Sequence, residues 1–80
     1  MSKPVPTRIL DRLDNDFTYH APGGDQVVRY GTLRDKGKEL AKLIAELSPE
    51  SREQSLSLTK VEEAIFWANA AIARNEHHDA

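Results

Sequence analysis

The stretch over residues 51–75, SREQSLSLTKVEEAIFWANAAIARN, places the strongest constraint on the fold of this 80-residue chain. Its second half, AIFWANAAIAR, is apolar on nearly every side of a helix, and such a helix must be buried all round. A chain of this length forms one small domain, which is marginally stable without disulfides, a bound metal or partner chains. The sequence has no cysteine for disulfides or thiolate zinc sites. We therefore expect the chain to assemble with copies of itself.

Two long helices are predicted. The first begins near Asp25 and ends at about Leu47, because positions suited to burial recur in it at spacings of three and four. These positions are Tyr30, Leu33, Gly37, Leu40, Ile44 and Leu47. A glycine inside a helix costs about 1 kcal/mol relative to alanine. We therefore expect another backbone or a ligand to approach closely at Gly37.

The second helix carries a similar stripe, formed by Leu58, Val61, Ile65, Ala68 and Ile72. It can begin with a capping box of Ser51 and Gln54, or at Ser48 with Pro49 in the first helical position. Either start leaves a short turn, so the two helices are expected to be antiparallel neighbours.

Apolar side chains remain on other faces of the second helix, among them Leu56, Phe66 and Trp67. Burying one large apolar side chain stabilises a fold by about 1.5–3 kcal/mol, so leaving these exposed is a substantial loss. The predicted fold class is therefore all-α: an antiparallel two-helix hairpin with an extended N-terminal arm, assembling into a helical homo-oligomer.

The segments outside the hairpin are short. We expect residues 1–14 to form an N-terminal tail in which residues 8–13 can make one helical turn. Residues 15–24, NDFTYHAPGG, form a non-helical arm, because Pro22 restricts the residue before it and Gly23–Gly24 interrupt regular structure. Residues 15–75 then make up the arm and the hairpin domain, and residues 76–80 form a C-terminal tail.

Charge and composition exclude several classes of function. A net charge of −2 argues against a general nucleic-acid binder, so no DNA partner is expected. No apolar run approaches the roughly 20 residues of a membrane span, and the N-terminus does not resemble a secretory signal. We expect a soluble, intracellular protein with no membrane partner. No nucleophile or metal-ligand spacing is present, so no enzyme activity, metal or cofactor is predicted.

The arm carries candidate ligand-binding aromatics. Phe17 and Tyr19 lie just before a helix N-terminus. Aromatic faces stack on nucleobases, and helix N-termini favour phosphate, which suits a nucleotide ligand. The same aromatics can instead pin the arm on a neighbouring subunit. Both interpretations remain open.

Basic and polar side chains on the helices are further candidates. Arg34 and Lys38 are four residues apart and share one side of the first helix, with Lys36 between them. They form either a phosphate-binding surface or a solvated face paired with acidic neighbours. Thr59 and Asn69 are polar residues on a helix that is expected to be buried, and buried polar groups need hydrogen-bond partners. They either fix the register between subunits or line a ligand pocket.

A family resemblance rests on the string FTYHAPGGDQ…RY…LR…K.LA.LI…PESREQSLSLTKVEEAIFWANAAIARN. It resembles the phage-encoded two-helix hairpin sponges that sequester the cyclic oligonucleotide signals of bacterial CBASS immunity. A related sponge against Thoeris signalling shares the hairpin. The resemblance runs from about Asn15 to Asn75 and is most specific in the Ser51-Arg52-Glu53 opening and the WANAAIAR close. Residues 1–14 lie outside it.

The resemblance implies a hexamer in the host cytoplasm, with cyclic dinucleotides such as cGAMP in pockets between protomers. Some family members also bind cyclic trinucleotides at a separate site. Tyr19, or failing that Phe17, is implied to stack on a base. Arg34 and Lys38 are implied to hold phosphates, with Lys36 as the alternate, and polar contacts at seams between subunits would come from Arg52, Thr59 and Arg74. The alternative is a helical structural or adaptor module that binds another protein through the apolar faces of the second helix.

Overall fold

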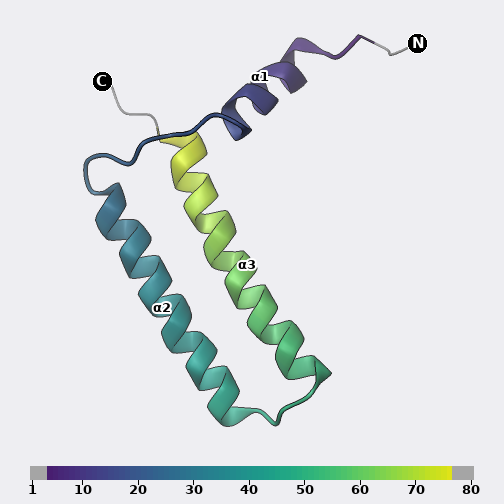
Figure 1. Ribbon diagram of the computed structural model, residues 1–80, viewed down its shortest axis with the longest axis vertical. Helices are drawn as coiled ribbons and strands as arrows, with labels where there is room; N and C mark the ends of the chain where they lie inside the picture. The colour runs from purple at the N-terminus through teal and green to yellow at the C-terminus, as the bar shows by residue number, and fades with distance from the viewer. Residues whose placement is uncertain (1–3, 77–80) are drawn as a thin grey trace.

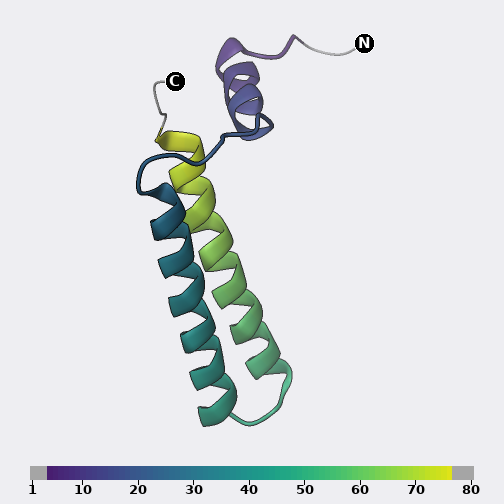
Figure 2. The same cartoon turned by 60° about the vertical axis from the view of Figure 1, so that its left-hand side comes forward.

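The computed structural model describes residues 4–76, and this part of the chain contains three helices and no strand. They are α1 (Thr7–Asp16), α2 (Gln26–Leu47) and α3 (Arg52–Asn75). Helices α2 and α3 lie side by side as an antiparallel hairpin, and α1 projects from its open end (Figures 1 and 2). The predicted all-α hairpin is therefore present.

The turn between α2 and α3 is stabilised by two side chains. The Ser51 Oγ caps α3 by accepting a hydrogen bond from the Gln54 backbone N–H at 3.1 Å. The Gln54 side chain does not return to Ser51 to complete the capping box. Its Nε2 instead donates to the Ser48 carbonyl at 2.8 Å and so closes the turn. Of the two predicted starts for this helix, the structure adopts the one at Ser51.

The seam between α2 and α3 is closest at Gly37, which is buried. A Cβ atom at this position would lie 2.6 Å from Cγ1 of Ile65 on α3. The close approach predicted at Gly37 is therefore real. It is made by a side chain of the partner helix rather than by a backbone or a ligand.

The hairpin forms one layer and encloses no apolar core. Within residues 4–76 no hydrophobic side chain is buried, and Gln26, at 2% exposure, is the one fully buried side chain. The molecule measures 49 × 41 × 13 Å, and its radius of gyration of 17.3 Å exceeds the roughly 12 Å of a compact chain of this length. Stable domains pack at least two layers around a core, so the single chain leaves its apolar faces uncovered.

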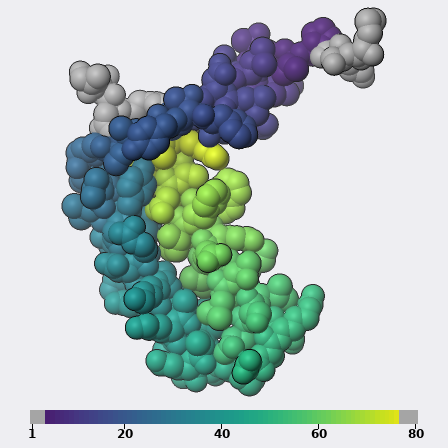
Figure 3. All heavy atoms as spheres, in the orientation of Figure 1, coloured from purple at the N-terminus to yellow at the C-terminus, as the bar shows by residue number. Residues whose placement is uncertain are grey.

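Helix α1 differs from the expected tail. The structure has a helix over Thr7–Asp16 where one turn was predicted over residues 8–13, and the arm consequently begins at Phe17 rather than at Asn15. Pro6 starts the helix, since its carbonyl accepts the Ile9 and Leu10 N–H groups. Figure 3 shows most of α1 projecting beyond the hairpin, and its C-terminal end contacts α3 through Asn15 and Asp16. Residues 1–3 and 77–80 of the two predicted tails lie outside the described residues.

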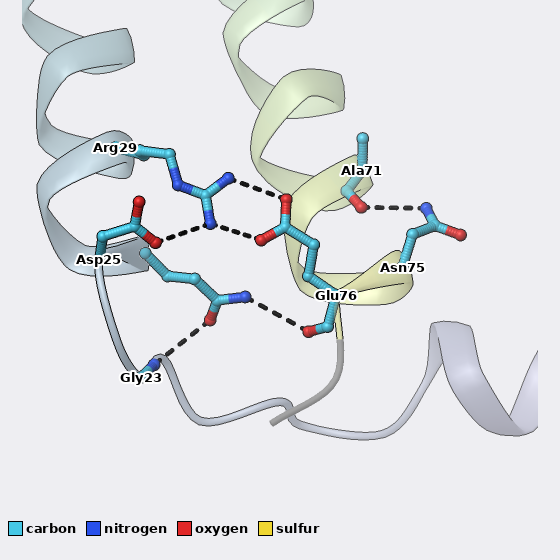
Figure 4. A network of polar contacts seen from close by, with 7 residues as sticks. Gly23, Asp25, Arg29, Ala71, Asn75 and Glu76 are labelled. Carbon is cyan, nitrogen blue, oxygen red and sulfur yellow. Dashed lines mark hydrogen bonds and ion pairs between the residues drawn. The ribbon is translucent and has the colours of Figure 1, made fainter. Parts of the chain in front are cut away.

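A polar network holds the open end of the hairpin together (Figure 4). The Arg29 guanidinium donates from Nη1 to Glu76 Oε2 at 2.8 Å, and from Nη2 to Glu76 Oε1 and to Asp25 Oδ1. These hydrogen bonds, first to Glu76 and then to Asp25, raise the pKa of Arg29 and keep it charged. In the same network, Gln26 accepts from the Gly23 N–H and donates to the Glu76 carbonyl, both at 3.3 Å. The start of α2 is thereby joined to the end of α3.

Candidate functional site

A groove of about 490 Å³ lies at the open end of the hairpin, where the arm crosses the end of α3 (Figure 3). We call it the open-end groove. Residues from α1, the arm, α2 and α3 line it: Asp16, Thr18, Tyr19, His20, Tyr30, Arg34, Phe66, Asn69, Ala70, Ala73 and Arg74. Its volume falls in the range of small-molecule sites.

Three of the candidate binding residues meet in this groove. Tyr19 comes from the arm and is 84% exposed, so its ring is available to a ligand. Arg34 comes from α2, one turn after Tyr30. Arg74 comes from the last turn of α3, where the helix dipole favours a positive charge. The groove therefore combines the exposed Tyr19 ring with two guanidinium groups, and the exposed Phe66 ring also lines it.

Arg74 is held in place by contacts with two helices. Its Nε lies 3.5 Å from Oδ1 of Asp16, the last residue of α1. Its guanidinium carbon lies 5.9 Å from the centroid of the Trp67 ring, within cation–π range. Its backbone carbonyl accepts a hydrogen bond from Asn15 Nδ2 at 2.9 Å. The same residue therefore anchors α1 and presents a positive charge to the groove.

The arm is positioned by a hydrogen bond to α1. His20 Nε2 lies 2.8 Å from the Asn15 carbonyl oxygen. Because a carbonyl can only accept, Nε2 carries the proton in this contact. The bond folds the arm back toward α1, and Tyr19 and His20 both line the groove.

Asn69 is an uncharged polar residue on the α3 wall of the groove. Its Oδ1 is buried and has no hydrogen-bond partner among the described residues. A buried acceptor without a donor is costly, so such an atom is suited to a donor from a ligand or a second chain. The sequence left Asn69 open between a ligand pocket and a subunit contact, and its place in the groove wall is compatible with both.

Several groove residues did not emerge as candidates from the sequence, notably Asp16, Tyr30 and Phe66. The sequence does contain one signal that could have identified Phe66. Phe66, Asn69, Ala70 and Ala73 recur at spacings of three and four, which defines a second stripe on α3 beside the one that faces α2. No comparable signal marks Asp16, because its approach to Arg74 depends on how α1 is placed.

The basic residues of α2 divide between two sides of the seam. Lys38 lines a neighbouring groove of about 410 Å³ that also contains Arg34, so these two share a face. Lys36 lines a different groove, together with Lys60, and its Nζ pairs with Glu39 Oε2 at 3.2 Å. The structure therefore separates Lys36 from the other two.

The remaining candidates lie outside the open-end groove. Phe17 directly follows α1 and is 86% exposed. Arg52 is the first residue of α3, at the turn end of the hairpin, and Thr59 is an exposed residue further along the same helix. These three side chains are exposed, so they are accessible to a second chain or to a separate ligand.

The open-end groove carries side chains that are suited to binding a ligand with phosphates and rings. Guanidinium groups bind phosphates through paired hydrogen bonds, and aromatic rings stack on bases. The residues lining it do not include a serine or cysteine nucleophile beside a base. Within residues 4–76 no group of three potential ligands could hold a metal ion, and no helix of that range is long and apolar enough to cross a membrane.

Comparison with known protein families gives one match. The family described as the Acb2/Tad1 hairpin domain matches residues 10–73. The matched range contains all of α2, the arm and most of α3, and it begins inside α1 rather than at Asn15. Comparisons with curated proteins and with solved structures give no match.

Proposed function

Since the chain belongs to the Acb2/Tad1 hairpin-domain family, we propose that it is a sponge that binds cyclic oligonucleotide immune signals and does not cleave them. The observation that supports this proposal beyond the family is the open-end groove, which places Tyr19 beside Arg34 and Arg74. That set matches the two chemical parts of a cyclic dinucleotide, its bases and its phosphodiesters.

Each groove residue takes a role that its chemistry suits. Tyr19 stacks on a base, because its exposed ring presents a free face. Arg34 and Arg74 hold the phosphodiesters, since a guanidinium donates two parallel hydrogen bonds to phosphate. Lys38 adds charge on the same face as Arg34. Polar contacts at other subunit seams would come from Arg52 and Thr59. Phe17 is the alternate for stacking, and Lys36 is the alternate for phosphate binding.

The proposal includes assembly into a homo-oligomer, with a hexamer as the expected form. The single chain exposes 59% of Phe66 and 58% of Trp67, whose rings pack edge-to-face at 5.1 Å. Two such side chains in water form an aggregation hazard unless another subunit covers them. A second copy packed on this side would also close the open-end groove over its ligand. The proposed setting is the cytoplasm of a phage-infected bacterium.

Isothermal titration with a panel of cyclic di- and trinucleotides tests the proposal, together with the native mass of the protein. We expect at least one ligand to bind tightly and to be recovered intact after the protein is denatured by heat. A cleaved product would identify an enzyme instead. Failure to bind any member of the panel would contradict the sponge function.

The exposed apolar faces also support a second candidate, an adaptor module that binds another protein. The two candidates differ in what covers Phe66 and Trp67. A monomer or dimer that strongly binds a dye for apolar surface would favour the adaptor. A hexamer that binds little dye would leave no such surface for a foreign partner.

A further inference from the structure

Asp16 places a carboxylate inside a groove that otherwise presents positive charge. It is the only acidic residue among the described residues that line the open-end groove, and its side chain is 26% exposed. Its Oδ1 lies 3.5 Å from Nε of Arg74, whose side chain is 32% exposed. One of the two guanidiniums in the groove is therefore partly neutralised by the chain itself.

We propose that Asp16 is a self-inhibitory anion that competes with a ligand phosphate for Arg74. This inference rests on the proposed function for the identity of the ligand. A phosphate on the Arg74 guanidinium would lie close to the Asp16 carboxylate, and like charges that share a site repel each other. Binding therefore exchanges the carboxylate for the phosphate, and Asp16 lowers the affinity for every anionic ligand of this groove.

The exchange also loosens α1. The contacts that join α1 to α3 include the Asp16–Arg74 ion pair and the hydrogen bond from Asn15 Nδ2 to the Arg74 carbonyl. A ligand phosphate that binds the Arg74 guanidinium breaks the ion pair with Asp16. The hydrogen bond from Asn15 to the Arg74 carbonyl is kept. Occupancy of the groove is thereby coupled to the attachment of α1, and α1 becomes less firmly held when a ligand binds.

Asp16→Asn tests the proposal, with Asp14→Asn as its matched control. Both substitutions remove one negative charge from α1, but Asp14 is exposed and does not line the groove. Asp16→Asn should not destabilise α1, because a carboxylate near the C-terminus of a helix interacts unfavourably with the helix dipole. Circular dichroism of both variants checks that the helix content is kept.

For cyclic dinucleotides titrated at low salt, we expect Asp16→Asn to bind about two- to fivefold more tightly than the wild type, the range of a partly exposed ion pair. We expect Asp14→Asn to stay near the wild-type affinity, and added salt to reduce the gain. In hydrogen exchange, ligand should increase exchange at the amides of α1 in the wild type, and less so in Asp16→Asn.

Two results would overturn the proposal, and they differ in what else they overturn. If the wild type binds and Asp16→Asn binds no more tightly than Asp14→Asn, the Asp16 inference fails and the sponge function stands. If the wild type and both variants bind no cyclic nucleotide, the sponge function fails together with it.

Discussion

Gly37 of α2 lies so close to Ile65 of α3 that a Cβ atom on the glycine would sit 2.6 Å from Ile65 Cγ1 and 2.9 Å from Cδ1. Carbon atoms pack at about 3.5–4.0 Å, so the absence of a side chain at Gly37 is what permits this approach. The pair sets the distance between the two long helices. The grooves on either side of it share Gly37 and Ile65, so their widths depend on the same contact.

Gly37→Ala is expected to lower the free energy of unfolding. Alanine gains about 1 kcal/mol in helix propensity, but forcing a methyl group into a filled seam costs about 1–3 kcal/mol. The net loss should be visible in urea denaturation at a fixed chain concentration. Gly31→Ala is the control, because the nearest atom to a Cβ there is an Arg34 side-chain nitrogen at 3.7 Å. That variant should gain up to about 1 kcal/mol, and equal gains in both variants would contradict a tight seam.

Gln26→Ala should destabilise the open end by about 1–2 kcal/mol. The substitution leaves the Gly23 N–H and the Glu76 carbonyl without the partner they have in the fold. Asn75→Ala is the control, since the Asn75 amide donates to the Ala71 carbonyl within its own helix and is exposed. We expect it to change stability by less than about 0.5 kcal/mol. Urea denaturation of the two variants at equal concentration measures the free energy of unfolding. Similar losses in both variants would show that Gln26 has no special role.

Tyr19→Ala should weaken the binding of cyclic dinucleotides by about 1–3 kcal/mol, the worth of one stacked base. Phe17→Ala is the matched comparison, because the two rings are almost equally exposed and only Tyr19 lines the open-end groove. Titration calorimetry measures both, and native mass checks that each variant still assembles. A larger loss in Phe17→Ala would transfer the stacking role to that residue. Dissociation of Tyr19→Ala would show that the arm is structural.

Arg34→Ala should reduce ligand affinity by about 1.5–3 kcal/mol, the range for a hydrogen bond to a charged group. Lys36→Ala removes the same charge from the other side of the seam and should leave affinity nearly unchanged. Arg34→Lys should recover part of the loss, because lysine keeps the charge but not the paired hydrogen bonds. Equal effects of the two alanine substitutions would mean that only net charge matters. Binding isotherms at two salt concentrations separate these outcomes.

Trp67→Ala should dissociate or destabilise the assembly, with a loss of about 3–5 kcal/mol if a second subunit buries the ring. The single chain leaves this ring 58% exposed, so a large effect would have to come from contacts between chains. Analytical ultracentrifugation across a range of concentrations measures it. A variant that keeps the wild-type mass at every concentration would place Trp67 outside the interfaces.

Local signals predicted much of the hairpin. Asp25 marked the start of α2, and the burial stripes marked the faces that meet at Gly37 and Ile65, because both depend on residues within one or two turns of each other. Leu40 and Leu47 of the first stripe stay 48% and 76% exposed in the single chain. The start of the second helix remained open, because both of its possible caps are local signals. Ser48 and Ser51 are both competent caps, and only the hydrogen bond from the Gln54 backbone N–H to Ser51 Oγ shows which one begins the helix. Helix α1 was underestimated, because its apolar pattern is too short to define a full helix.

The sequence by itself determined that this chain forms two long antiparallel helices and leaves apolar surface to cover, since helix periodicity and apolar excess are properties of the chain alone. Only the tertiary structure decided which polar residues meet. Asn15 and Arg74 are 59 positions apart, and their contact depends on the lengths of both helices, the closure of the turn and the bridge from Gln26 to Glu76. Small changes in any of these would move the arm. The meeting of Asp16 and Tyr19 with Arg34 and Arg74 in one groove is therefore a property of the folded molecule.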